Sequence, residues 1–143
     1  PVIVVTNQSG IARGRLDWND FHRVNARMHT LLADEAGARI GALLACADLP
    51  GQHDPAGWRK PGAGMFFTAS KAFGTRLAHS WMVGDKWSDL RAARRAGLAG
   101  AFHLHGREPG LRELRRGGFT LCSSGRLGDA ERVVASCVRE MMG

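Results

Sequence analysis

The stretch WMVGDKWSD, residues 81–89, ends an apolar run with a glycine and then places two carboxylates four residues apart. A short apolar run followed by a turn residue is typical of a buried strand that leads into a helix. At such a junction the spacing can turn Asp85 and Asp89 toward one point, where Mg²⁺ prefers oxygen ligands and keeps several waters. The alternative interpretation makes Asp85 the N-cap of the helix and Asp89 a favourable charge in its first turn.

Two further stretches put polar residues where an element should end: VIVVTNQSG at residues 2–10 and RKP at residues 59–61. In an open α/β sheet, ligands bind outside the carboxyl ends of the strands. There the Thr6 hydroxyl and the amides after it can donate to phosphoryl oxygens, and a lysine can approach one oxygen as a point charge. Lysine is rare in this arginine-rich chain, yet Lys60 and Lys86 both fall in the quoted stretches. Taken alone, the pair Thr6-Asn7 is more typical of an ordinary polar turn, whereas the full wording of residues 4–14 favours the phosphate-binding interpretation. As a bare tripeptide, Arg59-Lys60-Pro61 is more typical of a basic turn before a helix.

Strands and helices are expected to alternate along the chain. The patterns predict strands at residues 2–6, 40–45, 80–83, 99–104 and 119–122, and helices at residues 17–36, 65–73, 88–96 and 129–141. The helix at 17–36 is expected to begin at Asp17 and to bury one stripe, formed by Phe21, Val24, Met28, Leu31 and Leu32. This order predicts an α/β fold, with right-handed crossovers that place helices on both faces of a parallel sheet. Residues 1–143 are expected to form one domain.

In their order and wording, the three stretches resemble the second, third and fourth motifs of the haloacid dehalogenase superfamily of phosphatases. The wording is closest to the D-glycero-D-manno-heptose 1,7-bisphosphate phosphatase and histidinol-phosphatase branch, and the resemblance runs from Val2 through the final helix. It implies a Rossmann-like sheet and Mg²⁺-dependent hydrolysis of a small phosphorylated sugar through an aspartyl-phosphate. By this resemblance Thr6 and Lys60 are catalytic, Asp85 binds the metal with Asp89 in support, and the substrate contacts are Asn7, Gln8, Ser9, Arg59 and Lys86.

The chain departs from the family pattern in two places. The family opens with a strand that ends in Asp-x-Asp, whose first aspartate is the nucleophile, and these 143 residues begin at the second motif. We therefore expect a chain truncated at its N-terminus relative to the family, without the central strand between those ending at Thr6 and Val83, and inactive as given. The related enzymes also carry a zinc loop before Arg-Lys-Pro, of which only the first ligand position, Cys46, is matched here. Since a structural zinc site normally needs four ligands, zinc is not expected.

The amino-acid composition limits the partners and the location that the sequence allows. The net charge of +7 raises the possibility of a nucleic-acid partner, but the arginines are scattered over a predicted helix (Arg91, Arg94, Arg95) and a polar connector (Arg107, Arg112, Arg115, Arg116) without interleaved aromatic residues. A nucleic-acid-binding module therefore ranks behind a phosphatase and behind a non-catalytic relative that keeps the phosphate site. The sequence contains no apolar run of about 18 residues that could cross a membrane. Cytoplasm is the default location, and the sequence leaves the oligomeric state open.

Overall fold

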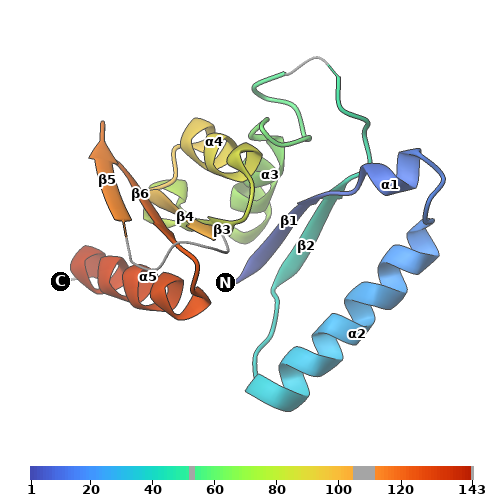
Figure 1. Cartoon of the computed structure of the whole chain (residues 1–143), viewed down its shortest axis with the longest axis horizontal. Coiled ribbons are helices and arrows are strands. Elements are labelled where there is room, and N and C mark those ends of the chain that lie inside the picture. The colour runs from blue at the N-terminus through green and yellow to red at the C-terminus, as the bar shows by residue number, and fades with distance from the viewer. Residues whose placement is uncertain (52–53, 105–111, 143) are drawn as a thin grey trace. The chain divides into compact units, whose positions relative to one another are not determined.

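The computed structural model describes residues 1–51, 54–104 and 112–142. The chain divides into two compact units, Pro1–Gln52 and His53–Gly143 (Figure 1). None of the helices in the described ranges is long and apolar enough to cross a membrane.

The first unit is a parallel strand pair joined by a helical crossover. Strand β1 (Ile3–Asn7) leads through the short helix α1 (Ser9–Ala12) into the long helix α2 (Trp18–Ala36), and the chain returns in strand β2 (Ala42–Cys46). The two strands pair in register from Ile3 opposite Ala42 to Asn7 opposite Cys46. The strand, helix and strand predicted for this region are confirmed within two residues at each end.

Helix α2 has the start and the stop that its sequence predicts. The Asp17 carboxylate accepts a hydrogen bond from the backbone N–H of Asp20, and the Asp20 side chain accepts one from the N–H of Asp17, which is a capping box. At the other end Gly37 adopts a left-handed conformation with φ 59°, which only glycine reaches without strain. Local chemistry alone therefore fixes both ends of this helix.

The buried stripe predicted for α2 is wrong at one position. Phe21 is buried and Met28, Leu31 and Leu32 are half-buried, but Val24 is 69% exposed. A helix that packs on a two-stranded sheet meets a narrow surface, because neighbouring strands lie only about 4.8 Å apart. The sheet therefore covers part of the apolar stripe and leaves the side chain of Val24 in solvent.

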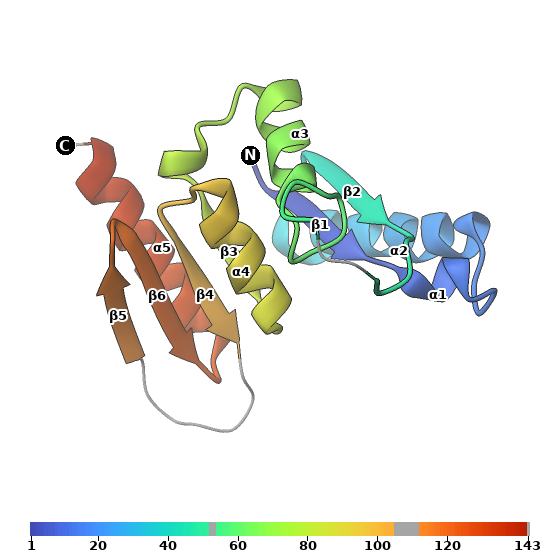
Figure 2. The ribbon, with the colours of Figure 1, turned by 90° about the horizontal axis from the view of Figure 1, so that it is seen from above.

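The second unit is a four-stranded sheet with helices on both faces. Its elements are α3 (Gly64–Phe73), the 3₁₀ turn η1 (Leu77–His79), β3 (Trp81–Gly84), α4 (Trp87–Ala96), β4 (Gly100–Leu104), β5 (Arg112–Arg116), β6 (Phe119–Ser124) and α5 (Leu127–Met142). The strand order is β3-β4-β6-β5, and β3, β4 and β6 run parallel (Figure 2). Helix α4 packs against β3 and β4, while α5 packs against β6 from the opposite face (Figure 1). This confirms the α/β fold with parallel strands and helices on both faces.

One buried cluster of this unit lies between the sheet and α5, and further buried apolar residues come from α3 and α4. Phe102 and Cys122, on adjacent strands, are fully buried with Ala130 of the helix, and Trp81 and Val133 pack around them. At the start of α5, Asp129 accepts a hydrogen bond from the Ser124 hydroxyl at 2.5 Å. This bond and the Arg132 guanidinium hold the pKa of Asp129 below its ordinary value, because both favour the charged carboxylate. Asp129 therefore joins the end of β6 to the first turn of α5.

The stretch expected as a polar connector contains a strand instead. Residues 112–116 form β5, which pairs antiparallel with β6 through a tight turn at Gly117 and Gly118, both with positive φ (58° and 74°). Two consecutive left-handed residues are the requirement of the hairpin turn that matches strand twist. The prediction missed it because charged residues at a sheet edge lack the apolar alternation that identifies a strand. Arg107 lies outside the described residues.

The strand pairings of the described residues join β1 to β2 in one sheet and β3 to β4 in another. The family's first strand is one that we expect these residues to lack. Its position between β1 and β3 in a longer chain stays a prediction.

Candidate functional site

A buried ion pair brings together two of the stretches singled out in the sequence. The Nζ atom of Lys60 lies 2.7 Å from Oδ1 of Asp89, and the two side chains are only 8% and 6% exposed. Removing either charge from water is costly unless an opposite charge and hydrogen bonds compensate it. The RKP turn and the first turn of α4 are therefore coupled by one charge-assisted contact, which fixes where the Lys60 ammonium lies.

Asp89 also orders the turn that precedes its own helix. Its second oxygen, Oδ2, accepts a hydrogen bond from the backbone N–H of Lys86 at 3.1 Å. A methyl group on Gly84 would lie 2.6 Å from the same oxygen, so the strand can approach the carboxylate this closely only with glycine at that position. Because both oxygens of Asp89 have partners, its side chain acts as a support for Lys60 and for the turn. Its role in support of a metal at Asp85 stays a prediction.

Asp85 and Lys86 follow β3 directly, and both are exposed. The N-cap position of α4 is occupied by Lys86, not by Asp85, so the alternative interpretation of Asp85 as a helix cap does not describe this turn. The Asp85 carbonyl oxygen lies 3.2 Å from Nε2 of His103 on β4. No three His, Cys, Asp or Glu side chains of the described residues gather as a complete metal site. An exposed carboxylate still suits Mg²⁺, which is often held by one or two protein carboxylates and completes its coordination with water or phosphate.

The loop that carries Arg59 and Lys60 is folded by its own backbone. The N–H of Ala63 donates to the carbonyl of Pro55 at 2.9 Å, and that of Gly64 donates to the carbonyl of Gly57 at 3.0 Å. A methyl group on Gly62 would lie 2.2 Å from the Gly57 carbonyl oxygen. The loop backbone is therefore in close contact with itself at Gly57 and Gly62, neither of which has a side chain. Arg59, which the family pattern assigns to substrate, is half-buried at the centre of this loop.

Arg95 of α4 also binds this loop, a contact that the sequence did not predict. The Arg95 guanidinium donates from Nη1 to the carbonyl oxygen of Pro61 at 2.8 Å. It is a second tie between the RKP turn and α4, beside the Lys60–Asp89 pair. Arg95 looked like part of a solvated arginine face, and nothing in its local sequence distinguishes it from Arg94.

The remaining predicted residues lie in the first unit. Thr6 and Asn7 end β1, Gln8 follows, and Ser9 begins α1. The Gln8 amide donates from Nε2 to the Thr6 hydroxyl oxygen at 3.1 Å, and the Gln8 backbone N–H donates to the carbonyl of Cys46 at 2.7 Å. A hydroxyl that accepts one hydrogen bond keeps its own proton as a donor. Thr6 is thus oriented at the end of its strand by the residue two places beyond it.

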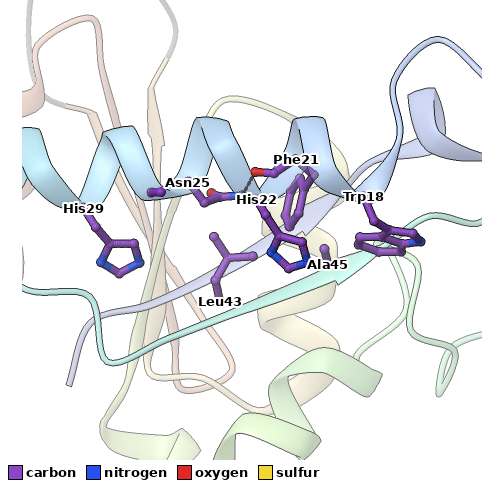
Figure 3. A pocket seen from close by; sticks show the side chains of 8 residues that line it. Trp18, Phe21, His22, Asn25, His29, Leu43 and Ala45 are labelled. Atoms are coloured by element: carbon purple, nitrogen blue, oxygen red, sulfur yellow. Dashed lines mark hydrogen bonds between the residues drawn. The ribbon is translucent and has the colours of Figure 1, made fainter.

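A hollow of about 380 Å³ in the first unit lies apart from these residues. It is bounded by α2 and β2, and its lining is Trp18, Phe21, His22, Asn25, Ala26, His29, Leu43 and Ala45 (Figure 3). None of the predicted site residues lines it. We therefore assign it no part in the candidate site.

Comparison with known proteins supplies the family. The profile of HAD-hydrolase-like proteins matches residues 57–116. A D-glycero-β-D-manno-heptose-1,7-bisphosphate 7-phosphatase from Mesorhizobium japonicum is 39% identical over 98% of this chain. The chain belongs to the haloacid dehalogenase-like superfamily. It spans 65% of the length of that Mesorhizobium relative.

Solved structures agree with this assignment. The crystal structure of a HAD-like phosphatase from Mesorhizobium loti is 35% identical and superposes with a TM-score of 0.80, covering 97% of this chain and 66% of the other. The D,D-heptose 1,7-bisphosphate phosphatase from Bordetella bronchiseptica, complexed with magnesium and phosphate, is 34% identical with a TM-score of 0.65, covering 72% of this chain and 55% of the other. The resemblance inferred from the three motifs is confirmed at the level of the superfamily and of its heptose bisphosphate phosphatase relatives.

Proposed function

We propose that this haloacid dehalogenase-like chain is the phosphate- and magnesium-binding part of a phosphatase that acts on a small phosphorylated sugar, such as a heptose bisphosphate. The observation that carries the proposal is the buried Lys60–Asp89 pair, whose aspartate also binds the N–H of Lys86, the residue after the exposed Asp85. It joins the third and fourth family motifs in one unit, as a phosphatase of this superfamily requires. The similarity to heptose bisphosphate phosphatases supports the choice of substrate class.

In this proposal Lys60 stabilises negative charge on the phosphoryl group during transfer. Asp89 holds the ammonium in place, so little reorganisation is needed when charge develops in the transition state. The covalent route of the family is attack by an aspartate carboxylate, followed by hydrolysis of the aspartyl-phosphate by water. No Asp-x-Asp sequence occurs in these 143 residues, so the chain as given lacks the nucleophile and is expected to be inactive.

Asp85 is proposed to hold Mg²⁺, which would neutralise phosphate charge when bound. Its carboxylate is exposed, and the turn behind it is fixed by Asp89, so the residues present fit a single protein ligand to an otherwise hydrated ion. We propose no role for zinc, because the loop before Arg59 is closed by backbone hydrogen bonds and carries a single matching ligand, Cys46.

The other family positions are proposed to bind substrate. Thr6 is proposed as a catalytic group whose hydroxyl donates a hydrogen bond to a phosphoryl oxygen, and Arg59 and Lys86 bind further anionic or hydroxyl groups of the sugar. Beside Thr6, the substrate contacts are Asn7, Gln8 and Ser9. We further propose that residues 1–143 belong to a single haloacid dehalogenase-like domain, truncated at its N-terminus relative to the family and located in the cytoplasm, with a phosphorylated metabolite as partner and no nucleic acid or membrane.

We propose as a second candidate a relative that binds phosphorylated sugars without hydrolysing them, because Lys60, Asp85 and Asp89 would serve phosphate and metal binding equally well in such a protein.

Adding the absent strand separates the two candidates. The test extends the chain at its N-terminus with the first strand of a close relative and measures phosphate release from a heptose 1,7-bisphosphate and from p-nitrophenyl phosphate. The phosphatase proposal predicts negligible turnover by the chain as given and magnesium-dependent turnover by the extended chain. In the extended chain, Lys60→Ala should lower turnover of both substrates, whereas Arg59→Ala should cost more with the sugar phosphate, which has distal groups to bind. An extended chain that binds the sugar phosphate without hydrolysing it would establish the binding relative instead.

A further inference from the structure

An aromatic pair, exposed at Trp87 and half-buried at His103, follows the proposed magnesium ligand. Trp87, the first residue of α4, is 62% exposed. Its ring centroid lies 5.0 Å from that of His103, with the planes tilted by 48°. Trp87 is the most exposed of the large aromatic side chains in the described residues, and an aromatic face in solvent is available to pack against a ligand.

The pair is fixed at the carboxyl edge of the sheet. His103 on β4 lies opposite Gly84, the last residue of β3, in the strand register. Its Nε2 atom is 3.2 Å from the carbonyl oxygen of Asp85. Trp87 follows Lys86 directly, so the aromatic surface borders the two residues proposed to bind magnesium and substrate.

The chemistry of the pair complements the part of the substrate that these charged residues do not bind. A sugar ring has polar hydroxyl edges and faces made of C–H groups, and the electron-rich face of an indole attracts such polarised C–H groups. A tryptophan also provides a large contact area at small cost in conformational entropy. Orthophosphate has no such face and gains nothing from it. We propose that Trp87 and His103 form a platform that packs against the ring of the phosphorylated sugar and selects it over orthophosphate, which has no ring; this inference rests on the proposed function.

Binding measurements on the chain as given test the platform without requiring turnover. The magnesium-loaded chain is titrated by calorimetry with D-glycero-β-D-manno-heptose 1,7-bisphosphate and, separately, with orthophosphate. We expect Trp87→Ala to raise the Kd of the bisphosphate about tenfold, or ~1.4 kcal/mol, and to leave the Kd of orthophosphate unchanged. Trp87→Phe keeps an aromatic face and should restore most of the affinity. Phe73→Ala is the matched control, because Phe73 is another exposed aromatic of this unit, 46% exposed at the end of α3.

Three outcomes would overturn the platform. If Trp87→Ala leaves the bisphosphate Kd unchanged, the ring does not contact Trp87, although the proposed function stands. If Trp87→Ala weakens both ligands equally, the residue supports the phosphate site and does not select the sugar. If neither ligand binds the unmodified chain, the proposed function fails and the platform fails with it.

Discussion

Breaking the Lys60–Asp89 pair should destabilise the second unit strongly. Lys60→Met leaves the Asp89 carboxylate buried without its cation, and Asp89→Asn leaves the Lys60 ammonium without its anion. Removing one partner of a buried pair typically costs about 3–5 kcal/mol, because the other charge stays buried and uncompensated. In a unit the size of residues 53–143, each kcal/mol corresponds to about 4–8 °C in Tm, so either single variant should melt more than about 10 °C lower.

A double variant at Lys60 and Asp89 separates the free energy of their mutual interaction from the contacts that each makes with its surroundings. Lys60→Met with Asp89→Asn removes both charges, and replacing a whole buried pair is often near neutral. The asparagine introduced by Asp89→Asn would keep an oxygen that can accept from the N–H of Lys86, the second contact that Asp89 makes. The double variant should therefore be more stable than either single variant, and a double-mutant cycle should give a coupling of at least about 2 kcal/mol.

Urea unfolding followed by circular dichroism measures these differences through the linear dependence of the unfolding free energy on urea. Arg23→Met serves as the control, because the Arg23–Asp20 pair is exposed and should contribute at most about 1 kcal/mol. A coupling energy below about 0.5 kcal/mol between Lys60 and Asp89 would be no larger than that of an exposed ion pair. It would refute the argument that Asp89 holds the Lys60 ammonium in place.

Three further predictions concern single positions. Gly84→Ala should displace the Asp89 carboxylate, whose Oδ2 would lie 2.6 Å from the new methyl group, and lower the Tm measured by calorimetry; an unchanged Tm would contradict this. Arg95→Ala removes the hydrogen bond to the Pro61 carbonyl and should speed amide exchange in residues 54–63, which hydrogen-exchange mass spectrometry measures, while Arg94→Ala should not. The folded-state pKa of Asp129 is lowered, so its stabilisation should be present above the ordinary value of 3.8 and disappear as the pH falls through the lower folded-state pKa. The difference in unfolding free energy between the unmodified chain and Asp129→Asn should accordingly shrink in acid, and a difference that grows there would refute the assignment.

Local chemistry made much of the fold predictable. Asp17 and Gly37 bound α2 through a cap and a left-handed stop, and Gly97 ends α4 in the same way with φ 76°. These signals work because they depend on the residues next to them in the chain. The charged strand β5 carried no such pattern. Its pairing depends on β6 and on the turn at Gly117 and Gly118, so it is decided by tertiary structure.

The candidate site likewise contains features that the sequence predicted and contacts that it could not predict. The motif order pointed to Lys60, Asp85 and Asp89, and the structure joins Lys60 to Asp89. The hydrogen bond from Arg95 to Pro61 and the close approach of Gly62 to Gly57 could not be predicted, since they join residues through a loop with no regular period. The burial of Val24 was misjudged because the pattern shows which face of a helix is apolar and not how wide a sheet covers it.

The most direct test of the proposed function asks whether the chain brings a divalent metal and a phosphate together. Mn²⁺, which is paramagnetic and prefers the same oxygen ligands as Mg²⁺, is added to the chain with heptose 1,7-bisphosphate, and the phosphorus NMR line widths are recorded. The proposal predicts broadening well beyond that of Mn²⁺ and the bisphosphate alone, and loss of the excess in Asp85→Asn, which removes the proposed metal ligand. Equal broadening with the unmodified chain, with Asp85→Asn and with no protein would contradict the claim that this chain holds both.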